Sequence, residues 1–167
     1  MTEDIRIEEI KFMSEIHKII RDNFMLFPQD ISNIELSTEQ EDTKESFDLV
    51  YNSRIEVSVR IRNNYALQWC DLTIRSKSRF GYKCEIDKLI DGKGSVYLYA
   101  WKTIDNSRFE TWILIDINKI RHLLPDFKNN VTMNRDGTGF ITIKIGLLKI
   151  ADAIINFYNL PSLFLNR

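Results

Sequence analysis

The stretch IEVSVRIR, residues 55–62, alternates apolar and polar side chains over its whole length. Because successive side chains of an extended chain point to opposite faces, the apolar residues share one face and the polar residues share the other. The apolar set is Ile55, Val57, Val59 and Ile61, and the polar set is Glu56, Ser58, Arg60 and Arg62. This period of two predicts a strand with one face on a core. The run FDLVY, residues 47–51, is joined to it by Asn52–Arg54 alone, so the two predict a β-hairpin.

Further elements are expected on both sides of this hairpin. Apolar residues recur at helical spacing over residues 3–26 and predict an amphipathic helix. Later segments predict strands at 69–76, 95–101 and 111–116, short helices at 84–92 and 117–124, a hairpin at 131–145, and a last helix at 147–158. We therefore expect an α/β (α+β) fold with a mixed, largely antiparallel sheet flanked by N- and C-terminal helices. Its length suits a single domain over residues 1–167.

The composition and charge limit the kinds of protein to which the chain can belong. The formal net charge is −1, so the chain as a whole lacks the basic balance of a non-specific nucleic-acid binder, although a local basic face is still compatible with it. The two cysteines, Cys70 and Cys84, form no metal or disulfide motif. The N-terminus is charged, and no apolar run is long enough to span a membrane. We expect an intracellular, cytoplasmic protein without a membrane segment.

Two groups of basic residues could bind a nucleic acid. The side chains of Arg60 and Arg62 lie on the same side of their strand. Their two guanidinium groups repel each other unless anions lie between or beside them, and these anions could be protein carboxylates or phosphates. The stretch 75–83 carries Arg75, Lys77 and Arg79 with aromatic residues between its charges, a composition that could follow a phosphate backbone and stack on bases. The plain alternative for both groups is a solvated surface with local ion pairs.

Acidic residues near these strands could support phosphodiester chemistry. The candidate catalytic residues are Asp48, Glu56, Asp71, Glu85 and Lys88. Asp48, Asp71 and Glu85 could hold Mg²⁺, which prefers carboxylate oxygens, and Lys88 could stabilise charge on a phosphate. The plain alternative for CEIDK, residues 84–88, is a surface ion pair, because Glu85 and Lys88 share one helical face.

The order of these residues resembles the PD-(D/E)XK nucleases, in which a helix precedes a hairpin that supplies an Asp and a Glu-X-Lys. Asp48 matches the Asp, and Glu56-Val57-Ser58 matches the Glu-X-Lys except that Ser58 replaces the Lys. The resemblance implies a restriction-endonuclease-like fold, with Arg60 or Lys88 supplying the missing cation and Glu9 or Glu15 of the preceding helix a further acid. The chain also resembles small phage-encoded proteins.

Two functions are open at this point. The first is a Mg²⁺-dependent nuclease or phosphodiesterase acting on nucleic acid. The second is a non-catalytic module on the same scaffold that binds nucleic acid or a protein, and a small interaction protein with no ligand site is a third alternative. Convergence of Asp48, Asp71, Glu85 and Lys88 would favour the enzyme, and their scatter over opposite faces would count against it. We further expect Arg60 and Arg62 to lie on the same side as Glu85 and Asp87, because their charges are complementary.

Overall fold

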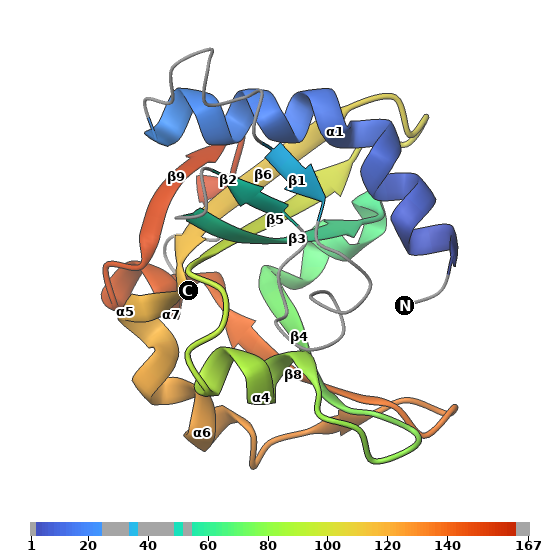
Figure 1. The fold of residues 1–167 in the computed structure, drawn as a ribbon, viewed down its shortest axis with the longest axis vertical. Helices are drawn as coiled ribbons and strands as arrows, with labels where there is room; N and C mark the ends of the chain where they lie inside the picture. Colours follow the sequence, from blue (N-terminus) through green and yellow to red (C-terminus); the bar gives the residue numbers. More distant parts are fainter. Residues whose placement is uncertain (1–2, 25–33, 37–48, 52–54, 163–167) are drawn as a thin grey trace.

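The structure is a computed structural model, and it describes residues 3–24, 34–36, 49–51 and 55–162, with side chains described for 11–24 and 55–162 (Figure 1). It has the expected mixed α and β content, arranged in two sheets where one was expected. The larger sheet has the order β1-β2-β3-β5-β6-β9, and the smaller has the order β4-β8-β7. Asp48 precedes β2 and lies outside the described residues.

The larger sheet is built around the strand that the alternating sequence predicts. Its strands are β1 (Ile34–Leu36), β2 (Leu49–Tyr51), β3 (Ile55–Arg62), β5 (Val96–Lys102), β6 (Phe109–Asp116) and β9 (Ile154–Tyr158). The expected hairpin is confirmed, because β2 pairs with β3 in antiparallel fashion. β3 and β5 are parallel, so the chain must cross over between them.

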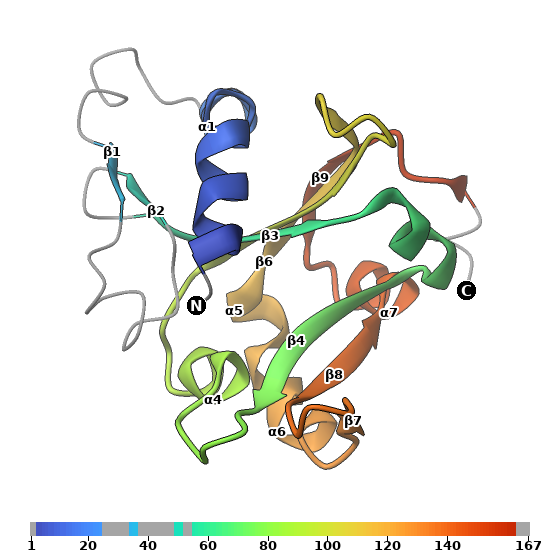
Figure 2. The same ribbon diagram turned by 90° about the vertical axis from the view of Figure 1, so that its right-hand side faces the viewer.

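The helix α1 (Glu3–Phe24) covers one face of this sheet. Its apolar stripe includes Phe12, Ile16 and Ile20, and these side chains are buried against Val57 and Val59 of β3. The expected N-terminal helix is thus confirmed, and its apolar face packs on the apolar face of the alternating strand. Figure 2 shows α1 on one side of the sheet and the smaller sheet with the short helices on the other.

The crossover from β3 to β5 forms much of the second layer. It contains a 3₁₀ helix η1 (Asn64–Trp69), β4 (Asp71–Lys77) and α4 (Glu85–Ile90). β4 pairs with β8 (Gly139–Lys144), which pairs in turn with β7 (Thr132–Met133). The short helices α5 (Ile117–Ile120), η2 (Arg121–Leu123), α6 (Leu124–Phe127) and α7 (Ile145–Ile150) complete this layer.

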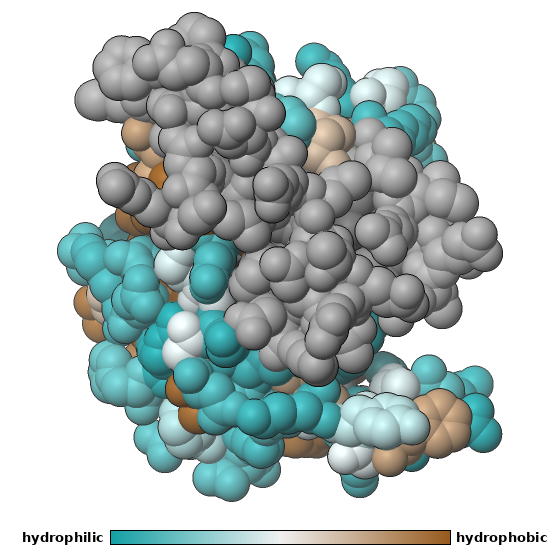
Figure 3. Space-filling view, viewed as in Figure 1, coloured by the Kyte–Doolittle hydropathy of each residue, from teal (hydrophilic) through white to brown (hydrophobic). Residues whose placement is uncertain are grey.

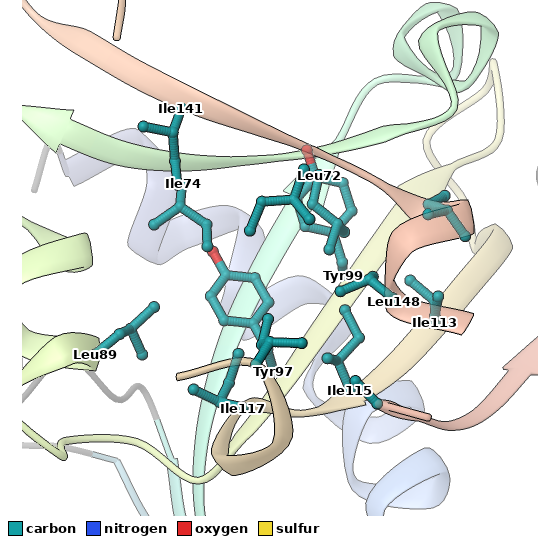
Figure 4. Packing of buried hydrophobic residues seen from close by; sticks show 14 of the residues in the cluster. Leu72, Ile74, Leu89, Tyr97, Tyr99, Ile113, Ile115, Ile117, Ile141 and Leu148 are labelled. Carbon is teal, nitrogen blue, oxygen red and sulfur yellow. The ribbon is translucent and has the colours of Figure 1, made fainter. Parts of the chain in front are cut away.

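The main core lies between the two layers. Tyr97 and Tyr99 of β5 point toward β4 and β8, where Leu72, Ile74 and Ile141 meet them (Figure 4). Trp101 is fully buried in the same cluster. The aromatic face of β5 is therefore part of the core, because the second sheet covers these rings.

The prediction of a helix over residues 147–158 is wrong for its second half, which forms a strand. Asp152 adopts a left-handed backbone conformation with φ +52° just after α7, and the chain then continues as β9. β9 pairs with β6, with Ile154 opposite Ile115 and Phe157 opposite Ile113. The apolar spacing fits a helix as well as a strand, and pairing with the sheet edge decides between them.

Candidate functional site

The polar face of β3 lies between the two layers and is not an open surface. Ser58 is 2% exposed, and the Arg60 side chain is 27% exposed. α1 occupies the apolar face of the strand, so the polar face turns toward β4 and α4. The residues on it therefore meet protein groups of the second layer.

Glu85, the first residue of α4, joins the two layers. Its Oε1 accepts a hydrogen bond from the Tyr97 hydroxyl at 2.6 Å, and its Oε2 accepts one from the Arg75 backbone N–H at 3.0 Å. The Arg60 Nη1 lies 3.8 Å from the same Oε2. Burial and the neighbouring Glu85 charge hold the pKa of Tyr97 well above its usual value, so the hydroxyl stays protonated and donates. The expectation that Arg60 and Glu85 lie on the same side of the molecule is confirmed.

Arg62 also finds its partner within the protein. Its Nη1 donates to Thr73 Oγ1 at 2.7 Å, and Thr73 Oγ1 lies 3.1 Å from the Tyr99 hydroxyl. The two guanidinium groups thus face acceptors of the second layer, which is the protein-acceptor alternative left open by the sequence. Sequence reasoning missed Thr73, Tyr97 and Tyr99 as partners. The hydroxyls of Tyr97 and Tyr99 were the available signal in the sequence, because a buried tyrosine needs a hydrogen-bond partner.

Asp71 belongs to a different place in the fold. Its carboxylate lies 3.5 Å from Lys144 Nζ of β8. Burial raises the pKa of Asp71, although the charges of Lys144 and Arg62 act in the opposite direction. Asp71 lies four positions before Arg75, whose backbone contacts Glu85, and this spacing amounts to about 13 Å along a strand. Asp71 and Glu85 therefore do not form the expected metal-binding pair.

Glu56 lies beside the C-terminal end of α4. The Gly94 N–H donates to Glu56 Oε2 at 2.9 Å, and the Lys93 N–H donates to the Lys88 carbonyl at 3.0 Å. Lys88 is 8% exposed and lies one helical turn after Glu85, so its side chain shares the face of α4 that turns toward the sheet. Glu56 and Lys88 are thus brought to one region by two separate elements.

Glu9 and Glu15 of the N-terminal helix were the two residues expected to supply a further acid to the site. Glu15 accepts the Phe109 N–H at 3.1 and 3.0 Å from its two oxygens, on the α1 side of the sheet, so it is not an acid of this region. The side chain of Glu9 is outside the described part of the chain, as is Asp48. Within the ranges given above, no three His, Cys, Asp or Glu side chains come together in a way that could hold a metal ion.

The short helix that carries Lys88 is well anchored. The Cys84 N–H donates to Asp87 Oδ2 at 2.9 Å and Lys128 bonds the other carboxylate oxygen. Burial acts to raise the pKa of Asp87, but the hydrogen bonds from Lys128 and Cys84 outweigh it and the pKa lies below its ordinary value. Beyond the helix, Gly92 has φ +94°, which favours glycine at a helix end. The position of Lys88 is therefore fixed by contacts at both ends of α4.

The basic side chains at the end of β4 and just after it are exposed. Arg75, Lys77 and Arg79 are all exposed, and the Arg79 guanidinium lies 5.8 Å from the centre of the Phe80 ring. The β7–β8 hairpin runs beside this stretch, since Lys77 pairs with Gly139. A Cβ at Gly137 in its turn would lie 3.8 Å from Arg79 Cγ, so the hairpin brings the exposed Arg135, two residues earlier, to the same part of the molecule. The linear sequence does not reveal this contribution.

No protein-family model matches this sequence, and the search of curated proteins gave no significant match. In the part of the chain that the structure describes, none of the helices combines the length and the apolar character needed to cross a membrane.

Proposed function

We propose that the chain is a Mg²⁺-dependent phosphodiesterase acting on nucleic acid, and that its chemistry takes place where α4 meets the polar face of β3. One observation carries the proposal: Glu56 of β3 accepts the Gly94 N–H in the loop that follows α4, the helix that carries the buried Lys88. The neighbouring Lys93 N–H bonds the Lys88 carbonyl, so this loop joins the two residues. A carboxylate and a lysine are the two kinds of side chain that metal-assisted phosphate cleavage requires.

The arrangement agrees with the resemblance to the PD-(D/E)XK nucleases. A helix, α1, precedes the hairpin, and Glu56 lies on its second strand. The sequence has Ser58 where that family has lysine, and Lys88 offers an ammonium group from the neighbouring helix instead. On this proposal the fold is restriction-endonuclease-like, and an intracellular, cytoplasmic location suits a nucleic-acid substrate.

The proposed roles follow from burial and charge. Lys88 would bind the scissile phosphate and stabilise the charge that grows on it, an interaction that is stronger where water is largely excluded. Glu56 would hold Mg²⁺ together with Asp48, which is next in sequence to Leu49, the residue opposite Val57. Mg²⁺ suits such a site because it commonly binds through one or two carboxylates and keeps several waters. When bound, the ion would neutralise phosphate charge and activate water.

The second candidate is a non-catalytic nucleic-acid-binding module on the same scaffold. The observation that favours it is the full engagement of Glu85, whose two oxygens accept from Tyr97 and Arg75 while Arg60 lies alongside. A carboxylate held in this way has a structural role, which reduces the number of acids left for a metal.

A digestion assay with Mg²⁺ or Mn²⁺ on single- and double-stranded DNA and RNA separates the two candidates. We expect Lys88→Met, Glu56→Gln and Asp48→Asn each to abolish cleavage. Asp71→Asn is the matched control and should retain activity, because Asp71 pairs with Lys144 far from Glu85. Absence of cleavage by the wild-type protein, together with no Mg²⁺ binding by calorimetry, would leave the non-catalytic module.

A further inference from the structure

A projection at one end of the second layer is formed by two segments far apart in the sequence. Residues 77–83 lead from β4 to α4, and residues 133–138 form the turn between β7 and β8; we call the two together the arm. Figures 1 and 2 show both segments at the same end of the molecule, beyond the smaller sheet. They lie close together, because Lys77 pairs with Gly139 and a Cβ added at Gly137 would lie 3.8 Å from Arg79 Cγ.

The arm exposes two aromatic rings. Phe80 and Tyr82 are each 74% exposed, and their ring centres are 6.1 Å apart. Neither ring belongs to a buried cluster, so packing of the core does not account for them. Figure 3 shows hydrophobic surface next to hydrophilic surface on this projection. Exposed aromatic rings set among polar groups are typical of a binding surface.

The charges around the rings are mostly positive. Lys77, Arg79 and Arg135 are exposed cations of the arm. The carboxylate of Asp136 is used inside the turn, where its Oδ1 accepts from the Thr138 N–H at 3.0 Å and from the Thr138 hydroxyl at 2.7 Å. The arm therefore offers cations and flat apolar rings together, which is the combination that binds phosphates and stacks on bases.

Hydrogen bonds within the loop fix the backbone that carries the two rings. The Ser78 hydroxyl oxygen accepts hydrogen bonds from the backbone N–H groups of Phe80 and Tyr82, both at 3.1 Å. Between them Gly81 has φ +75° and donates its N–H to the Ser78 carbonyl at 3.3 Å. A loop that is already ordered loses less conformational entropy when it binds.

We propose that the arm binds single-stranded nucleic acid, with unpaired bases stacked on Phe80 and Tyr82 and phosphates held by Lys77, Arg79 and Arg135. The inference rests on the proposed function, of which it names the substrate class. Unpaired bases are required because the faces of paired bases are hidden inside a duplex. An acidic peptide would match the cations but would leave the two rings without stacking partners.

The arm is also connected to the proposed reaction site. The loop runs directly into α4, and Lys88 lies in that helix. Arg75, just before the loop, donates its backbone N–H to Glu85, so the base of the arm is fixed to the first residue of α4. A strand bound along the arm would therefore reach the start of the helix that carries Lys88.

The test is fluorescence anisotropy of a labelled 20-mer oligothymidine with the full chain, in EDTA so that binding is measured without cleavage. Phe80→Ala/Tyr82→Ala should weaken binding at least about tenfold, a low bound for losing two stacked bases. Arg79→Ala should reduce the slope of log Kd against log salt concentration by about 0.7, as for one phosphate contact to a single strand. Ser78→Ala, which keeps both rings but removes their hydroxyl anchor, should give a smaller loss.

Two variants elsewhere on the surface serve as controls. Tyr158→Ala removes an exposed aromatic residue of β9, and Lys18→Ala removes an exposed cation of α1; both should bind like the wild type. Circular dichroism checks that every variant is folded. Wild-type affinity in the double variant, equal affinity for a 20-base-pair duplex, or no binding at low salt would each overturn the proposal, and the last result would point to a protein partner.

The two proposals fail separately. Binding in EDTA that depends on Phe80 and Tyr82, without cleavage in Mg²⁺, refutes the phosphodiesterase and leaves the arm as a binding surface. Cleavage that is unchanged in the Phe80→Ala/Tyr82→Ala variant, with unchanged binding, refutes the arm and leaves the phosphodiesterase.

Discussion

The Arg60 guanidinium of β3 lies 3.8 Å from the Glu85 carboxylate of α4, and this ion pair links the two layers of the fold. The same carboxylate accepts hydrogen bonds from the Tyr97 hydroxyl and the Arg75 backbone. Both side chains of the pair are mostly buried, at 27% and 20% exposed, so the pair is only partly screened by solvent. Glu85 is therefore held by two hydrogen bonds as well as by the ion pair with Arg60.

The two partners should differ in their effect on stability. Arg60→Ala leaves Glu85 with two hydrogen-bond donors, so we expect a loss of about 1 kcal/mol or less. Glu85→Ala leaves the buried Tyr97 hydroxyl without this acceptor and the Arg60 charge without this partner, so we expect a loss of about 3 kcal/mol. Urea denaturation of both variants measures the difference. Equal losses would mean that Glu85 acts through the ion pair alone.

The Tyr97 hydroxyl can be tested by itself. Tyr97→Phe keeps the buried ring and removes the hydrogen bond of 2.6 Å to Glu85. We expect a loss of about 1–2 kcal/mol in the free energy of unfolding, since the acceptor is charged. Tyr65→Phe is the control, because Tyr65 is 59% exposed, and its stability should stay within about 0.5 kcal/mol of the wild type. A Tyr97→Phe variant as stable as the control would contradict the hydrogen bond as a stabilising contact.

Asp71 should give the stability a distinctive dependence on pH. Burial raises the pKa of its carboxyl above 3.8, so between 3.8 and the raised value the folded protein binds more protons than the unfolded chain. The free energy of unfolding contributed by Asp71 is then fully present below 3.8 and falls as the pH rises through this window. Asp71→Asn cannot ionise and does not show this fall.

The measurement is urea denaturation of the wild type and Asp71→Asn from about pH 3.5 to about pH 7, which spans the titration of carboxyl groups. Relative to the variant, the wild type should lose stability as the pH rises. A constant difference at every pH would show that Asp71 titrates alike in the folded and unfolded chain, and a difference of opposite sign would show that the Lys144 ion pair outweighs burial.

Local patterns in the sequence predicted several features of the fold and of the site. The alternation in 55–62 predicted a strand whose two faces meet different layers, because it depends only on side-chain spacing within one element. Charge complementarity predicted Arg60 near Glu85, because a partly buried guanidinium needs an acceptor from another element. The departure of β4 (Asp71–Lys77) into a second sheet was not predictable in this way. Its alternation suits either sheet, and pairing with β8, more than sixty residues away, decides the outcome. The same non-local pairing separates Asp71 from Glu85.

Gly139 should be intolerant of a side chain because of where β8 passes its neighbours. A Cβ there would lie 2.6 Å from Val131 Cγ1 and 3.1 Å from both Lys77 Cβ and Met133 Sδ. The Cβ of Lys77 cannot move without shifting the backbone, and Val131 can withdraw its methyl only by leaving its preferred χ1 rotamer. We therefore expect Gly139→Ala to cost about 1–3 kcal/mol through overpacking. For a chain of this size that lowers Tm by roughly 2–4 °C per kcal/mol.

Gly92→Ala is the matched control, since its φ of +94° carries backbone strain but no atom lies within 4 Å of the added Cβ. Its cost should be about 1 kcal/mol. Thermal denaturation followed by circular dichroism compares the two, and the inference of a tight β4–β8–β7 contact fails should Gly139→Ala melt at or above the temperature of Gly92→Ala.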